Sequence, residues 1–146
     1  MYTNILVALD GSEHAAHALN TAVGLARRCE AGLVLLHSVQ SNPFRSDFGV
    51  MVTRSAREVL DRIGREQADA ILGEAEHTAR AAGVDKVTRV VGEGDPVKAA
   101  LKAIPENGVD LVVVGTRGLT GLHEIALGSV AHKMTVVAPC PVLVVK

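Results

Sequence analysis

The stretch DLVVVGTRGLTGLHEIALGSVAHK, residues 110–133, joins a short apolar run, a glycine-rich segment and the start of a helical pattern. The apolar run, 110–114, has the length and continuity of a strand buried on both faces of a sheet. Glycines follow at 115, 118, 121 and 128, although each costs conformational entropy on folding. The stretch therefore predicts a buried strand that leads, through bare backbone, into a helix.

The rest of the chain alternates in the same way between apolar runs and amphipathic segments. The other predicted strands are 4–10, 32–39, 86–91 and 142–145. The strand at 86–91 is less apolar than the others and is expected nearer a sheet edge. Helices between consecutive strands indicate right-handed crossovers. The predicted class is α/β, with one doubly wound, five-stranded parallel sheet and helices on both faces, Rossmann-like.

Capping residues and prolines set the predicted ends of the helices. Ser12 is the expected N-cap of the first helix, and Gly32 suits its C′ position. A long amphipathic helix is predicted from residue 54 to Gly83, with the approximate apolar stripe Leu60, Ile63, Ala70, Ile71, Ala75 and Ala79. Asp95 is the expected N-cap of the third helix, with proline at its first position and another proline, at 105, as its end. The last helix is expected over 129–137.

Length and composition indicate one domain, 1–146, and exclude several classes of protein. Aromatic residues make up only 2% of the chain and the net charge is −1, which argues against nucleic-acid partners and an anionic membrane surface. The opening MYTNILVALDGSE has no basic region, and its apolar run is too short for a signal peptide or membrane span. Cys29 and Cys140 have no metal or redox spacing, so a cytoplasmic protein with free thiols is expected.

Two loops are expected to face each other where a parallel sheet binds ligands, beyond the carboxyl ends of its strands. One is Asp10–Ser12, and the other is the glycine-rich stretch. In that stretch Gly115 and Gly118 would let backbone N–H groups approach a ligand, and Arg117 would supply positive charge. Gly128-Ser129 opens a helix whose N-terminus favours phosphate. The arrangement indicates an anion cradle, with a nucleotide as the expected ligand.

The residues alone leave alternatives open for both loops. The glycines also fit a purely structural role, making turns and letting a helix pack closely on the sheet. Asp10 would either accept hydrogen bonds from a ribose hydroxyl, help to place a metal ion, or cap the turn before the first helix. None of the six histidines forms a metal motif, and His37 is expected as a core histidine. Ser129 lacks a nearby base, so no catalytic residue and no metal site are predicted.

The segment 40–53, QSNPFRSDFGVMVT, mixes turn-forming residues with both phenylalanines of the chain. It is expected to be an ordered loop or lid.

The spacing Gly115-x2-Gly118-x9-Gly128-Ser129 resembles the G-x2-G-x9-G-[ST] motif of ATP-binding universal stress proteins. NILVALDGSE, GDPVKAALKAI, DLVVVGTRG and APCPVLVVK are also similar to segments of that family, so the resemblance covers essentially the whole chain. It implies strand order 3-2-1-4-5, with Asp10 on the nucleoside, backbone near Val39 facing adenine, and the glycine stretch on ribose and phosphates. The full implied site is Ala8, Asp10, Val39, Val114, Gly115, Arg117, Gly118, Gly128, Ser129 and Val130.

The resemblance further implies a regulatory nucleotide-binding protein of the stress response or of signalling. Its ligand would be ATP, with AMP or ADP as alternatives and with magnesium as a companion. Family members commonly pair their last strands, which predicts a homodimer through Val142, Leu143, Val144 and Val145. The sequence departs from the family's pattern at His132, where the family often has a glutamate. It also differs from a P-loop, because no lysine of that motif follows the glycines. Efficient phosphoryl transfer is therefore not expected, and a slow ATPase or a nucleotide-independent dimeric scaffold remain the alternatives.

Overall fold

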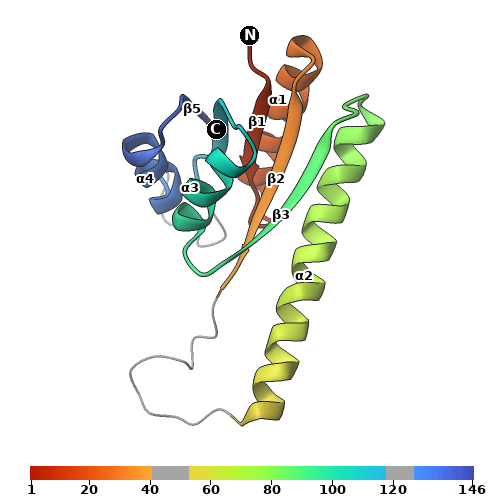
Figure 1. Ribbon diagram of the computed structural model, residues 1–146, viewed down its shortest axis with the longest axis vertical. Coiled ribbons are helices and arrows are strands. Elements are labelled where there is room, and N and C mark those ends of the chain that lie inside the picture. The colour runs from red at the N-terminus through yellow and green to blue at the C-terminus, as the bar shows by residue number, and fades with distance from the viewer. Residues whose placement is uncertain (41–52, 118–126) are drawn as a thin grey trace.

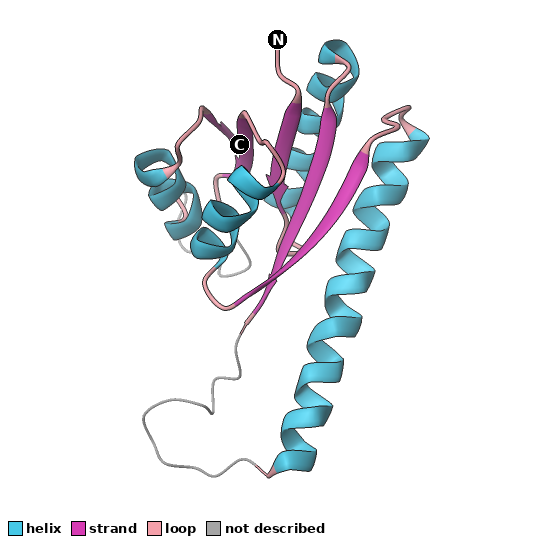
Figure 2. Ribbon diagram, in the orientation of Figure 1, coloured by secondary structure: helices cyan, strands magenta, loops and turns pink. Residues whose placement is uncertain are grey.

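A computed structural model describes residues 1–40, 53–117 and 127–146. Strands and helices alternate along the chain, as Figures 1 and 2 show. The strands are β1 Asn4–Ala8, β2 Gly32–Val39, β3 Val87–Glu93, β4 Leu111–Gly115 and β5 Val142–Val145. The helices are α1 Glu13–Cys29, α2 Arg54–Ala81, α3 Pro96–Glu106 and α4 Ser129–Val137. The expected loop or lid over 40–53 lies almost entirely outside the described residues.

The five strands form one parallel sheet in the order β3-β2-β1-β4-β5, which confirms the predicted fold class and strand order. Along β1, Ile5 is level with Leu33 of β2 on one side and with Leu111 of β4 on the other. The less apolar β3 lies at one edge of the sheet, as predicted, and β5 lies at the other. The strand order thus reverses between β1 and β4. Open α/β sheets bind ligands at this position.

Alternate residues of the central strands pack into two separate cores, one on each face of the sheet. Ile5 and Val7 belong to the core beneath α1 and α2. Leu6 of the same strand belongs to the core beneath α3 and α4. Because successive side chains of a strand point to opposite faces, a continuous apolar run supplies both cores at once.

The predicted N-caps of α1 and α3 are confirmed, but the predicted ends of these two helices are not. The Ser12 hydroxyl accepts from the N–H of Ala15, and Asp95 caps α3. Gly32, however, is not the C′ residue of α1: the left-handed residue is Glu30, with φ 54°. A Cβ at position 32 would lie 2.8 Å from the side-chain oxygen of Asn4, so close strand packing accounts for this glycine. Pro105 lies inside α3, which ends one residue later.

The predicted stripe of α2 is only half correct. Ala75 and Ala79 are buried against the sheet and Ile71 is partly buried, but Leu60, Ile63 and Ala70 are exposed. The sheet therefore supports the second half of the helix and not the first, which extends past the end of the strands (Figure 1).

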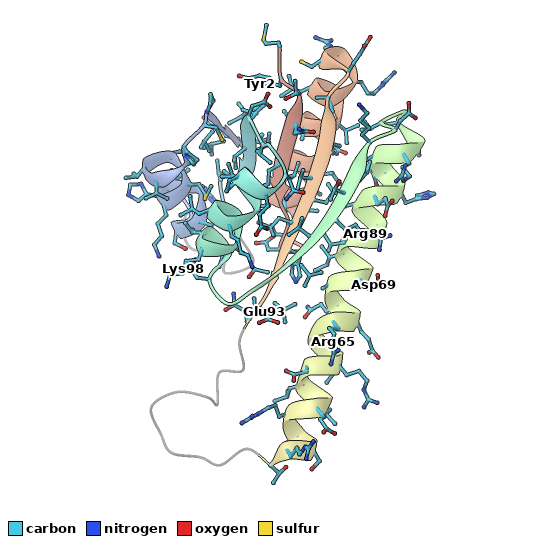
Figure 3. The ribbon with its side chains drawn as sticks, viewed as in Figure 1. Tyr2, Arg65, Asp69, Arg89, Glu93 and Lys98 are labelled. Carbon is cyan, nitrogen blue, oxygen red and sulfur yellow. The ribbon has the colours of Figure 1, made fainter. Side chains whose placement is uncertain are left out.

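Ion pairs hold the supported half of α2 to β3. Arg89 of β3 pairs with Asp69 at 3.1 Å (Figure 3). Arg89 also pairs with Glu76. Glu76 also accepts from Arg80 at 2.8 Å, and the hydrogen bonds from Arg80 and Arg89 lower the pKa of its carboxyl group. Asp69, Arg80 and Arg89 are exposed and Glu76 is partly exposed, so solvent screens these pairs and each contributes little to stability.

Candidate functional site

The candidate site is built on the adjacent carboxyl ends of β1 and β4. Val7 and Val113 are register partners, and Ala8 and Val114 come directly after them in the two strands. Val114 is 2% exposed, whereas Ala8 is partly exposed. The two loops that the sequence singled out therefore leave the sheet side by side, as the crevice hypothesis requires.

The loop after β1 is a tight turn closed by Asp10. Its Oδ1 accepts from the backbone N–H of Ser12 at 2.9 Å, and Gly11 between them has φ 81°. That left-handed conformation favours glycine, so the sequence Asp-Gly-Ser suits the turn. Asp10 thus has the capping role that the sequence left open. Among the described residues only Oδ1 takes part in a hydrogen bond, which leaves Oδ2 to a ligand.

The loop after β4 begins with a glycine that has a packing role. A Cβ on Gly115 would lie 2.7 Å from the carbonyl oxygen of His14 and 2.9 Å from its Cβ. The missing side chain therefore lets the first turn of α1 rest against the end of β4. For this residue the structure supports the helix-packing alternative.

Thr116 is the residue that connects the parts of the site, and the sequence analysis missed it. Its N–H donates to Val145 of β5 at 2.9 Å, and its carbonyl accepts from the N–H of Gly128 at 2.6 Å. Its hydroxyl lies 3.4 Å from Nδ1 of His14. A threonine between two motif residues carries no distinctive signal in sequence, because its partners lie far away along the chain.

The amino end of α4 reaches the carboxyl end of β4 through Gly128. A Cβ on this glycine would lie 2.9 Å from the Thr116 carbonyl oxygen, so glycine permits the close approach. Gly128 itself is the N-cap, and no side chain caps the helix among the described residues. Ser129 is therefore the first helical residue, and its hydroxyl does not cap the helix. It is exposed, and Val130 is partly buried.

The free N–H groups of this helix end give the site its expected affinity for anions. The first N–H groups of a helix have no partner within the helix, and the helix dipole adds positive potential there. Arg117, partly buried, follows Thr116 directly and so lies beside the same helix end. Gly118 lies outside the described residues.

Val39 is the one described candidate that lies apart from this group. It ends β2, three residues beyond Leu36, the register partner of Ala8. Its carbonyl accepts from the N–H of Gly94 at 2.8 Å, and its side chain lies against α2 at Gly64. Only a ligand that extends along β2, past the end of β1, would reach it.

His37, expected in the core, is partly buried and bound to the backbone. One of its ring nitrogens, Nδ1, lies 2.8 Å from the carbonyl oxygen of Leu9, just before the Asp10 turn. His37 therefore helps to hold β2 to the end of β1. Within the described ranges there is no cluster of three metal-ligating side chains.

Comparison with known proteins places the chain in a family that matches it over its whole length. The model of the universal stress protein family matches residues 1–146. Universal stress protein YxiE of Bacillus subtilis is 36% identical over 149 residues, which cover 100% of both chains. In the described part of the chain, no helix has the length and apolar character needed to span a membrane.

Solved structures agree with this match. Universal stress protein UspA from Lactobacillus plantarum superposes with a TM-score of 0.82 at 26% identity, covering 99% of this chain and 98% of that one. A universal stress protein in complex with cAMP superposes with a TM-score of 0.75 at 29% identity, covering 99% and 97%. The chain belongs to the universal stress protein family.

Proposed function

We propose that this protein binds an adenine nucleotide at the carboxyl ends of β1 and β4. The preferred ligand is ATP, with AMP or ADP as alternatives. The observation that carries the proposal is the convergence of the Asp10 turn, Arg117 and the uncapped start of α4 at one point of the sheet. The cAMP complex of a relative 29% identical to this chain supports the same ligand class.

Each group at the site has a role that follows from its chemistry. The N–H groups of Ser129 and Val130, which have no partner within the helix, would donate to phosphate oxygens, and Arg117 would neutralise part of their charge. Oδ2 of Asp10 would accept from a ribose hydroxyl, or help to hold a magnesium ion that accompanies the phosphates. Ala8, Val114, Gly115 and Gly118 would line the site with small or apolar groups. Val39 would contact the adenine only with the base extended over β2.

Replacing one charge tests where the phosphates bind. Arg117→Gln is expected to weaken ATP binding on the order of tenfold while leaving adenosine almost unaffected, because only the phosphates need the guanidinium. Isothermal titration calorimetry measures both affinities. Arg28→Gln is the matched control, since Arg28 is exposed in the last turn of α1, at the opposite end of the sheet. Equal losses for ATP and adenosine, or no loss of either, would contradict the assignment of Arg117.

The proposed role is regulatory and cytoplasmic, in the stress response or in signalling. No Lys-Ser or Lys-Thr pair follows the glycines as in a P-loop, so the chain lacks the lysine that holds the phosphates in that class of enzyme. A slow ATPase is the alternative function. Measuring ATP hydrolysis distinguishes it from the regulatory role. Protein incubated with magnesium and ATP should retain intact nucleotide in the regulatory case and accumulate ADP in the other.

We further propose that the protein is a homodimer through β5. This strand is a sheet edge, and its four residues, Val142–Val145, are all partly exposed. An apolar edge without a partner is prone to pairing, and a second β5 would complete its hydrogen bonds. Light scattering coupled to gel filtration tests this. Replacing Val144 by proline removes a backbone donor from the edge and should lower the measured mass.

A further inference from the structure

The hydrogen bonds between β1 and β2 end irregularly, beside the candidate site. The last backbone bond between the two segments runs from the N–H of Leu9 to the carbonyl oxygen of Leu36, at 2.8 Å. β2 continues to Val39, beyond the end of β1 (Figure 1). A regular parallel ladder would next join the N–H of Ser38 to the carbonyl oxygen of Leu9. The His37 imidazole takes that place, with Nδ1 2.8 Å from the oxygen.

The chemistry of the partner fixes which ring nitrogen of His37 carries a hydrogen. A carbonyl oxygen can only accept a hydrogen bond, so Nδ1 is protonated and donates to Leu9. The ring is partly buried at the end of the two strands. A side-chain donor therefore replaces the backbone donor of the next residue, Ser38.

This replacement leaves the backbone N–H and C=O of Ser38 without a partner among the described residues. In a strand between two parallel neighbours, successive residues direct these groups to alternate sides. The Leu36 carbonyl bonds toward β1, and the Val39 carbonyl bonds to Gly94, just after β3. By this alternation the Ser38 groups face the space beyond the end of β1. Since backbone groups are rarely left unpaired, a free donor and acceptor on one residue there suit a ligand.

The same bond from His37 fixes the entry to the Asp10 turn. Leu9 directly precedes Asp10, so its carbonyl belongs to the peptide group that leads into the turn. His37 holds the oxygen of that peptide group, and the N–H of Ser12 holds Oδ1 of the Asp10 carboxylate. The carboxylate is thus restrained from both sides, while its Oδ2 has no partner in the described chain.

We propose that His37 is a positioning residue for the nucleoside half of the ligand. By holding the Leu9 carbonyl, it orients Asp10 toward the ribose and leaves the Ser38 N–H and C=O to the edge of the base. An adjacent donor and acceptor match the ring nitrogen that accepts and the amino group that donates on adenine. The inference rests on the proposed nucleotide function. A histidine that only joined β1 to β2 would change stability but not nucleoside affinity.

Two variants of similar shape separate the hydrogen bond of His37 from its packing. His37→Leu removes the donor, whereas His37→Asn keeps an N–H at the position of Nδ1. His37→Leu is expected to weaken adenosine and ATP by the same factor, on the order of tenfold, because both ligands contain the nucleoside. His37→Asn should retain most of the parent's affinity. Isothermal titration calorimetry measures all of these values. Unchanged affinities in His37→Leu, or equal losses in the two variants, would overturn the proposal.

Asp110→Asn is the matched control for a general loss of stability. Asp110 accepts hydrogen bonds from the start of β1, at the opposite end of the sheet from His37. This variant should unfold at a lower urea concentration and bind adenosine as the parent does. If it lost as much adenosine affinity as His37→Leu, the proposal would be overturned.

The parent protein distinguishes this inference from the proposed function. A parent that bound neither ATP nor adenosine would contradict both. A parent that bound them, with a His37→Leu variant that bound them equally well, would contradict only the role of His37.

The tautomer of the neutral His37 ring tests the contact without any substitution. Long-range ¹H–¹⁵N spectra of the parent protein distinguish a hydrogen on Nδ1 from one on Nε2. The bond to Leu9 predicts a hydrogen on Nδ1, both with and without adenosine. A neutral ring with its hydrogen on Nε2 would overturn the proposal, because such a ring cannot donate to the Leu9 carbonyl from Nδ1.

Discussion

Gly115 and Gly24 are chemically identical residues in opposite surroundings. A Cβ at 115 would lie within 2.9 Å of three atoms of His14, whereas a Cβ at 24, in α1, would meet nothing within 4 Å. Gly115→Ala should therefore lower the free energy of unfolding by about 1–3 kcal/mol, because α1 must move away from β4. Gly24→Ala should raise it by about 0.5–1 kcal/mol, through better helix propensity. Urea unfolding measures both, and similar values for the two would contradict the close approach of α1.

Asp110 ties the start of β1 to the start of β4, and its effect should depend on pH. It accepts from the N–H and hydroxyl of Thr3, at 2.8 and 2.7 Å, and from the N–H of Asn4 at 3.1 Å. Burial alone would raise the pKa of the Asp110 carboxyl, but these hydrogen bonds outweigh it and lower the pKa. The stabilisation is thus present above the unfolded-state pKa and is lost as the pH falls through the lower folded-state value.

Asp110→Asn should accordingly cost about 1 kcal/mol of unfolding free energy at neutral pH. The difference between variant and parent should shrink as the pH falls below about 4, where the carboxyl of the unfolded parent is already protonated. Chemical denaturation at a series of pH values checks this. A difference that stays constant down to acid pH would mean that the charge of Asp110 does not contribute.

At the scale of single elements, α2 contains two glycines with different costs. Gly73 lies in the supported half, where an added Cβ would stay 3.6 Å from the Arg89 guanidinium, an ordinary contact. Gly73→Ala should stabilise the protein by about 1 kcal/mol, as helix propensity predicts. Gly64→Ala should gain less or even destabilise, because its Cβ would meet Val39 at 2.7 Å. Thermal unfolding of both variants tests this, and equal gains would show that α2 does not rest on Val39.

The elements themselves were largely predictable from periodicity and caps. Strands β2 and β5 and helix α4 begin and end where the sequence indicates, and Ser12 and Asp95 cap as expected. The errors have a common cause. The burial of an apolar residue in α2 depends on where the sheet ends, and local spacing contains no information about that end. For the same reason Leu60 and Ile63 belong to the predicted stripe but are 38% and 52% exposed.

At the scale of the whole molecule, nucleotide binding should raise the stability of the folded protein. A ligand that binds only the folded state, present at a hundred times its dissociation constant, stabilises by about 2.7 kcal/mol. ATP should therefore raise the melting temperature in a concentration-dependent way, whereas a nucleotide-independent scaffold would melt at the same temperature with and without it. The Arg117→Gln variant should need a higher ATP concentration for the same rise in melting temperature. A parent protein that ATP does not protect would favour the scaffold.

The sequence by itself determined the order of strands and helices along the chain. Because a helix separates each pair of consecutive strands, right-handed crossovers then indicate a doubly wound parallel sheet. It also located the two loops of the candidate site, since they follow β1 and β4 and the glycine spacing is visible in the chain. Only the tertiary structure decided how residues far apart meet: Gly115 beneath His14, Thr116 bound to Gly128 and Val145, Val39 apart from the group, and the free half of α2. The physical reason is that secondary structure follows from neighbouring residues, whereas close approach depends on how separate elements pack.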